Sequence, residues 1–284
     1  MKLTFLGTGA ASAYPLPFCQ CAYCRTAREQ KGKNLRRRSS VLINSDLLID
    51  LGPDVVPSAC EYGIDLTKVR FLLQTHAHSD HFDPGHLITR IPEYAGQGIS
   101  RWNLAASRET LRKMGRRLCG EEPGVDLFDP KWKEKLNLAV FPVSAGESIQ
   151  LGTYHVTALD ACHDESEQAL IYAVRQGGRE LLYATDLCRL EAASWEILKG
   201  FSFDYVILDQ TYGPGTTGGG HLNADQVVEI IAEMRSQGIL KPNGESYATH
   251  LSHEGNPPHN ELARFAASRG YQIAYDGLVL ETEE

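Results

Sequence analysis

The segment VRFLLQTHAHSDH, at residues 69–81, places four metal-ligand-type side chains directly after an apolar run. Val69–Leu73 predicts a buried strand, and the polar cluster follows where the strand ends. Imidazole nitrogen and carboxylate oxygen are common ligands of zinc, manganese and iron. His76 and His78 would project to one side of an extended segment, while Asp80 and His81 lie where the chain can turn. The segment therefore predicts ligands for two adjacent metal ions.

Composition narrows the class of protein. The chain has 284 residues, 42% of them hydrophobic and 23% charged, as expected for one large globular domain or two small ones. No apolar run approaches the roughly 20 residues of a membrane span, and the N-terminal apolar stretch is too short for a signal peptide. We therefore expect a cytoplasmic protein without a membrane partner. The net charge of −8 is poorly suited to long nucleic acid, although a metal centre can still bind a small anion.

The cysteine pattern indicates a second kind of metal site. Seven cysteines argue against complete disulfide pairing, and three of them cluster at Cys19, Cys21 and Cys24. In a reducing compartment such a cluster more often binds metal than forms disulfides. The alternative is three free thiols in a mobile loop.

Single histidine or aspartate residues also follow three later apolar runs. They are His163, Asp186 and His250, each just beyond a predicted strand. Residues in loops at strand ends often form functional sites, although each of these alone is more typical of a capping or core residue. The order of predicted strands and helices is compatible with an α/β or α+β fold. Residues 101–135 have mixed composition in their second half and predict an insertion, and residues 214–220 predict a glycine-rich loop.

The motif His-x-His-x-Asp-His, followed in order by these three residues, resembles the ligand pattern of the metallo-β-lactamase superfamily. This resemblance implies one domain over residues 1–284, folded as a four-layer αββα sandwich. It also implies two divalent metals with shared ligands: His76, His78 and His163 on one metal, Asp80, His81 and His250 on the other, and Asp186 bridging both. Zinc, manganese and iron all suit this nitrogen and oxygen set.

Two further segments resemble the PhnP-like phosphodiesterase subgroup of that superfamily. They are FCQCAYC at residues 18–24 and THLSH at residues 249–253. The resemblance implies a structural zinc held by a closed Cys3His set: Cys19, Cys21, Cys24 and His253. It also places His221 where a subgroup histidine contacts the substrate phosphate. A homodimer is implied by the family alone.

The implied activity is hydrolysis of a small cyclic phosphate by a metal-bridging hydroxide. The resemblance points to a ribosyl 1,2-cyclic phosphate or a nucleoside 2′,3′-cyclic phosphate. Asp80 would orient the attacking water, and His221 would bind a phosphate oxygen or protonate the leaving group. The segments 101–135 and 214–220 have no clear counterpart in the family, and we expect them to shape substrate choice.

Three alternatives share parts of this pattern. A tRNA 3′-processing endonuclease has the same first motif, but it would need a long basic arm, and the acidic balance argues against one. A thioester or lactone hydrolase also shares the first motif. The alternative of another class is a non-catalytic binding protein, similar to the pyrroloquinoline quinone biosynthesis protein with a zinc loop and degenerate ligands. The complete set of seven ligand-type residues argues against it.

Overall fold

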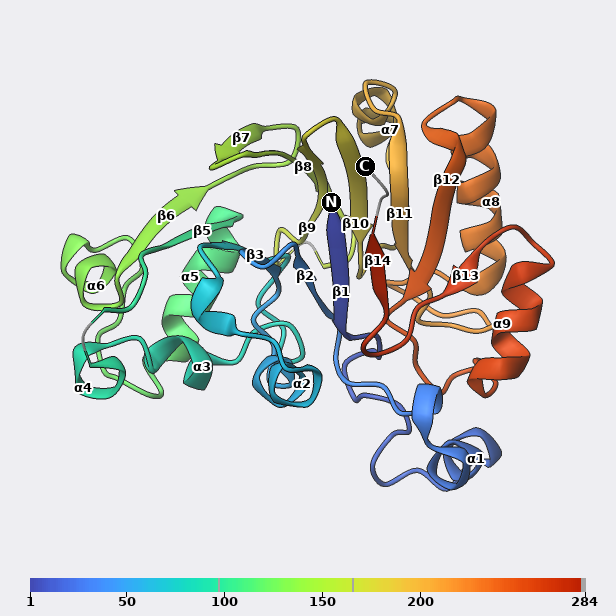
Figure 1. Ribbon diagram of the computed structural model, residues 1–284, viewed down its shortest axis with the longest axis horizontal. Coiled ribbons are helices and arrows are strands. Elements are labelled where there is room, and N and C mark those ends of the chain that lie inside the picture. The colour runs from blue at the N-terminus through green and yellow to red at the C-terminus, as the bar shows by residue number, and fades with distance from the viewer. Residues whose placement is uncertain (97, 165, 282–284) are drawn as a thin grey trace.

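Two mixed β-sheets packed face to face form the centre of the computed structural model, and helices cover both outer faces (Figure 1). The structure describes residues 1–96, 98–164 and 166–281, and over these residues each sheet has seven strands. The first sheet has the order β14-β1-β2-β3-β4-β5-β6, and the second has the order β13-β12-β11-β10-β9-β8-β7. This arrangement confirms the predicted αββα sandwich.

The strands of the first sheet are β1 (Lys2–Gly7), β2 (Ser40–Ile43), β3 (Leu47–Ile49), β4 (Phe71–Leu73), β5 (Trp102–Ala106), β6 (Leu138–Pro142) and β14 (Val279–Glu281). Those of the second are β7 (Ser148–Leu151), β8 (Tyr154–Asp160), β9 (Leu170–Gln176), β10 (Arg179–Ala184), β11 (Phe203–Asp209), β12 (Leu240–Thr249) and β13 (Gln272–Ile273). The α-helices are α1 (Ala22–Gln30), α2 (Val55–Tyr62), α3 (Pro84–Ile88), α4 (Pro92–Ala95), α5 (Arg108–Leu118), α6 (Pro130–Lys135), α7 (Ala192–Leu198), α8 (Ala224–Ser236) and α9 (His259–Ala267). Two short 3₁₀-helices are η1 (Gly32–Asn34) and η2 (Leu66–Lys68).

Alternating side chains along the central strands build three apolar layers. In β11, Tyr205 and Ile207 face the core between the sheets, whereas Val206 and Leu208 face the helices outside. Successive residues of a strand point to opposite faces, so a strand buried on both faces is apolar almost throughout. The outer layer of the second sheet packs against α7, α8 and α9, and that of the first sheet against α2, α3, α5 and α6.

Several predicted elements have different bounds in the structure. Residues 84–94 predict one helix, but the structure divides them into α3 and α4, with Pro92 at the start of α4. Proline disfavours a helical conformation in the residue before it, which explains the break. Strand β7 and helices α1 and α6 were not predicted from the sequence. Residues 101–135 contribute β5, which pairs with both β4 and β6, as well as α5 and α6. That this segment is an insertion stays a prediction.

One edge of the sandwich collects the ends of strands from both sheets. Strands β3, β4 and β5 run parallel to one another, as do β10, β11 and β12, so their carboxyl ends meet at this edge. Two bonds join the sheets there: the Leu170 amide donates to the Thr75 carbonyl (3.0 Å), and the Tyr172 hydroxyl donates to the Gln74 carbonyl (2.8 Å). Loops that leave this edge carry the polar clusters described below. Among the described residues, none of the helices is long and apolar enough to cross a bilayer.

Candidate metal centre

Three histidines form a group beside Asp186, and two of them lie near one of its carboxylate oxygens. His76 and His78 come from the loop after β4, and His163 comes from the loop after β8. His76 Nε2 lies 3.0 Å from His78 Nδ1 and 3.9 Å from Asp186 Oδ1, which is also 3.6 Å from His163 Nε2. The ligand atoms of the three histidines all lie within 4.8 Å of one another. This distance suits a single cation between them.

The other oxygen of Asp186 faces a second group. Oδ2 lies 3.0 Å from His81 Nε2 and 3.4 Å from His250 Nε2. Asp80 completes this group, because its Oδ2 lies 3.0 Å from His81 Nε2 and 3.5 Å from His250 Nε2. Asp186 thus lies between two sets of ligand-type atoms, as a bridging carboxylate would. The cluster fits a dinuclear site of divalent metals.

Unpaired buried atoms support this fit. His81 Nε2, His250 Nε2 and Asp186 Oδ2 are buried, and despite their short separations none of them makes a hydrogen bond of suitable geometry with the described residues. Buried polar atoms are nearly always hydrogen-bonded, because leaving one unpaired costs about 1–3 kcal/mol. All three point to the same place, where a cation would satisfy them together.

The electrostatics of the cluster also favour positive charge. Burial acts to lower the pKa of His81, but the carboxylates of Asp186 and Asp80 hold it well above its ordinary value. Burial likewise opposes protonation of His250, yet Asp186 and Asp209 raise its pKa to about 10. Burial acts to raise the pKa of Asp186, and the surrounding imidazoles hold it well below its usual range. The carboxylates therefore demand positive charge, which protons on the imidazoles or divalent cations can supply.

The outer nitrogen of each buried imidazole has a partner of its own. His81 Nδ1 lies 2.7 Å from Asp50 Oδ2, and His76 Nδ1 lies 3.0 Å from Thr75 Oγ1. Asp50 is itself held by three donors: the Thr75 amide and hydroxyl and the side-chain amide of Gln74. Such contacts fix the ring orientation of a ligand and tune its basicity.

The same arrangement recurs on the second sheet. His250 Nδ1 lies 2.8 Å from Thr211 Oγ1, and His163 Nδ1 lies 2.8 Å from the Gly220 carbonyl. Asp209, at the end of β11, accepts from the Asp186 amide at 3.1 Å. Here too, every partner comes from a loop or strand end at the shared edge.

The sequence alone did not assign a role to Asp50, Thr75, Asp209 or Thr211. One signal was present, because Asp50 and Asp209 are acidic residues at strand ends. A second signal exists only in the backbone. Asp50, Asp186 and His250 have φ angles of 65°, 52° and 59°. Residues other than glycine rarely adopt this left-handed region, and such strain concentrates at functional sites.

His221 lies at the rim of the cluster. Its ring centre is 4.6 Å from that of His163 and 5.3 Å from that of His250. Nδ1 faces Asp209 Oδ2 at 3.1 Å, and the side chain is 17% exposed. A cavity of about 750 Å³ opens beside His163 and is lined by both basic and acidic side chains, among them Arg108, Arg189, Asp164 and Glu191. The structure thus places His221 beside the ligand-type residues and not among the buried ones.

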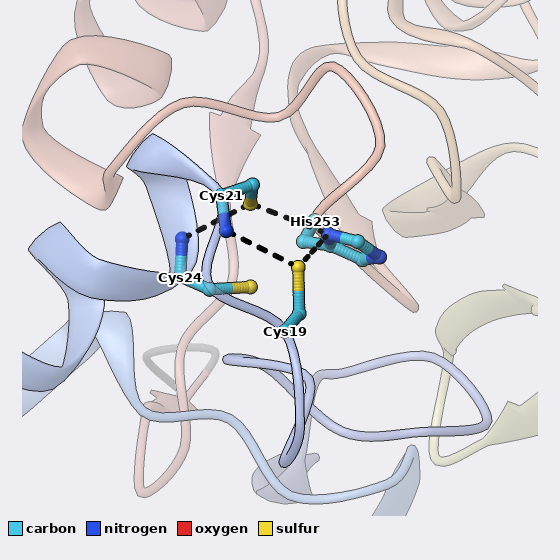
Figure 2. A group of neighbouring side chains, drawn as sticks. All are labelled: Cys19, Cys21, Cys24 and His253. Carbon is cyan, nitrogen blue, oxygen red and sulfur yellow. Dashed lines mark hydrogen bonds between the residues drawn. The ribbon is translucent and has the colours of Figure 1, made fainter.

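The cysteine cluster forms a separate site, shown in Figure 2. Cys19 Sγ and Cys21 Sγ each lie 3.6 Å from His253 Nδ1, and the ligand atoms of these residues and Cys24 are within 4.8 Å of one another. Burial acts to raise the pKa of Cys21, but contacts with His253 and the Cys24 amide lower it to about 6. Burial raises the pKa of Cys24 to about 12, so a bound cation would be needed to hold that sulfur as a thiolate. The three sulfurs and one nitrogen are the donor set of a tetrahedral zinc site.

Comparisons with known proteins agree with this geometry. The profile of the beta-lactamase superfamily domain matches residues 46–250. The crystal structure of a diphosphatase from the PhnP family is 29% identical, with a TM-score of 0.72 over 99% of this chain and 98% of that one. This similarity confirms the predicted PhnP-like character.

Two more distant structures share the fold. Zn²⁺-bound PqqB from Methylobacterium extorquens is 17% identical, with a TM-score of 0.74 over 99% of this chain and all (100%) of that one. The short form of human tRNase Z is 18% identical, with a TM-score of 0.66 over 99% of each chain. No curated protein sequence matches this chain.

Replacing Asp50 by asparagine is expected to weaken metal binding about 10–100-fold, because His81 loses the charge that orients it. The affinity is measured by zinc competition with a chromogenic chelator. Asp204→Asn is the control, since Asp204 pairs with Lys241 away from the cluster. Equal affinity in the two variants would contradict a role for Asp50 in metal binding.

Replacing Cys21 by serine is expected to remove one zinc per chain and to lower the melting temperature, because a structural zinc contributes folding free energy directly. Zinc content and thermal unfolding are measured on the same sample. Cys60→Ser is the control, since Cys60 is an exposed cysteine outside the cluster. An unchanged melting temperature and zinc content would argue against a zinc site at this cluster.

Proposed function

Because this chain belongs to the metallo-β-lactamase superfamily, we propose that it is a metal-dependent hydrolase that cleaves a phosphodiester bond in a small substrate. The observation that carries this proposal is the position of Asp186, with one oxygen toward each of two groups of ligand-type atoms. The ligands would be His76, His78 and His163 for one metal, Asp80, His81 and His250 for the other, and Asp186 for both. Cys19, Cys21, Cys24 and His253 would hold a structural zinc.

Each group at the site has a distinct part in the reaction. Two divalent metals, when bound, would lower the pKa of a bound water and would place positive charge beside the phosphate oxygens. Asp80, a carboxylate within the cluster, would orient the attacking water. His221 has one nitrogen directed to Asp209, which leaves Nε2 available. In the protonated ring, Nε2 can donate to a phosphate oxygen or to the leaving group.

The surroundings favour a small substrate over a nucleic acid. The cavity beside His163 has a volume of about 750 Å³, which suits a molecule the size of a nucleotide. A net charge of −8 would repel long polyanions. Similarity to a diphosphatase of the PhnP family supports a phosphate-containing substrate. Nucleoside 2′,3′-cyclic phosphates and a ribosyl 1,2-cyclic phosphate are the proposed substrates. Manganese as an alternative to zinc, a cytoplasmic location and a homodimer stay predictions.

Replacing Asp186 by alanine is expected to reduce hydrolysis of bis(4-nitrophenyl) phosphate by at least about 100-fold, because both metal positions lose a shared ligand. The rate is measured together with circular dichroism and metal content. Asp204→Asn again serves as the control. Full activity after chelation of all metals would overturn the proposed mechanism. Faster cleavage of a thioester than of any phosphodiester would favour the alternative hydrolase class.

Replacing His221 by alanine is expected to lower kcat about 10²–10⁴-fold toward a 2′,3′-cyclic nucleotide, while metal content stays at the wild-type value. The reason is that His221, at the rim of the cluster, would contact the substrate and not the metals. Its loss leaves the buried metal-binding histidines and their hydrogen-bond partners in place. Steady-state kinetics and metal analysis test this expectation. Unchanged kcat, or a loss of metal that matches the loss of rate, would contradict it.

A further inference from the structure

His78 differs from the other proposed ligands in its surroundings. Its side chain is 39% exposed, whereas the next most exposed histidine ligand, His163, is 9% exposed. Nδ1 of His78 faces His76, so Nε2 points out of the cluster. There it lies 3.7 Å from Asp164 Oδ2 and 3.7 Å from Glu167 Oε1. These distances exceed a direct hydrogen bond but place both carboxylates beside the outer ring nitrogen.

Of the two carboxylates, Glu167 is the one that is firmly held. Its side chain is 7% exposed, compared with 39% for Asp164. One carboxylate oxygen accepts from the Ala77 amide at 3.2 Å, and the other pairs with the ammonium group of Lys113 on α5. A buried carboxylate needs such partners to remain charged.

The backbone of Glu167 is fixed as well. Its carbonyl accepts from the Thr110 hydroxyl at 3.1 Å and from the Ser107 hydroxyl at 3.4 Å, both at the start of α5. Arg117, near the end of α5, donates to the Ala77 carbonyl. Helix α5 therefore anchors both Glu167 and the peptide that Glu167 binds.

These contacts join two distant parts of the chain. Ala77 lies between His76 and His78, and Glu167 lies in the same β8–β9 connection as His163. The bond between Glu167 and Ala77 thus fastens together the segments that supply all three histidines of one metal position. The histidines of the other position, His81 and His250, have their own partners in the segments that follow β3 and β11.

We propose that Glu167 is a positioning residue that sets the affinity of one metal position and leaves the other almost unchanged. It acts in two ways: it holds the loop carrying His163 against the Ala77 peptide, and it places negative charge beside the outer nitrogen of His78. A carboxylate at that place orients a histidine ligand and raises its basicity. This inference rests on the proposed function, because it takes His76, His78 and His163 as ligands.

Glu167→Gln tests the proposal, since glutamine keeps the size and one acceptor but removes the charge. Zinc content is measured by mass spectrometry after dialysis against a series of buffered free zinc concentrations. The wild-type chain is expected to hold about three zinc ions, two at the cluster and one at the cysteines. In Glu167→Gln, one of the three is expected to require about 10–100-fold more free zinc, and the other two should follow the wild type.

Glu180→Gln is a matched control. Glu180 also accepts from a backbone amide, that of Ser202, and pairs with a cation, Arg175, but it lies away from the cluster. Its zinc titration should match that of the wild type. Melting temperatures of both variants, measured with all sites loaded, separate a loss of affinity from a loss of fold.

Two results would overturn the inference. One is a Glu167→Gln titration that matches the wild type. The other is an equal weakening of both cluster metals together with a lower melting temperature, since that would indicate a general structural role. A wild-type chain that holds zinc only at the cysteines would instead overturn the proposed function, and this inference would fall with it.

Discussion

A buried carboxylate between opposing imidazoles is the constraint on which the structure depends. Asp186 is 2% exposed, and its two oxygens face His163 and His76 on one side and His81 and His250 on the other. A charge in such a place is tolerated only when it is compensated. The need for compensating positive charge beside Asp186 accounts for the histidines around it. It also couples folding of this edge of the sandwich to the binding of protons or cations in the cluster.

The sandwich meets this demand by bringing strand ends from both sheets to one edge. The ligand-type residues follow β4, β8, β10 and β12, and their outer partners follow β3, β4 and β11. The backbone bends sharply at three of these ends, where Asp50, Asp186 and His250 adopt left-handed conformations. Such conformations cost about 1–3 kcal/mol each, so contacts with the surrounding sheets must stabilise them. Two packed sheets with buried central strands provide that support, which loops alone would not.

How far the sequence predicts this site depends on the range of each signal. One local motif can be recognised from a short segment alone: His76, His78, Asp80 and His81. His163, Asp186 and His250 carry no local signal beyond their position after a strand, and the family resemblance alone collected them into one set. The αββα architecture likewise needed the resemblance, since strand periodicity predicts strands but not their order in a sheet.

The remaining features depend on contacts between distant segments. Asp50 is an ordinary residue at the end of a hairpin until the fold brings it 2.7 Å from His81. Glu167 has no pattern around it, because its contacts with Ala77 and Lys113 span 90 and 54 residues. Helix α1 has few apolar residues to predict it, and its start is set by the Cys21 side chain accepting from the Cys24 amide. The break before Pro92, by contrast, follows from a local rule and was predictable.

The cysteine cluster and Glu167 each contact a loop that carries ligand-type residues of the centre. His253 is three residues beyond His250, and the segment between them is held by backbone bonds: the Leu251 amide donates to the Thr8 carbonyl, and the Ala10 amide donates to the Leu251 carbonyl. A zinc on Cys19, Cys21, Cys24 and His253 would therefore fasten the N-terminal loop to the loop that carries His250. Glu167 fastens the loop that carries His163 to the one that carries His76 and His78. Each proposed metal position thus contains a histidine from a loop of the second sheet, and contacts with the first half of the chain hold that loop or would hold it once zinc is bound.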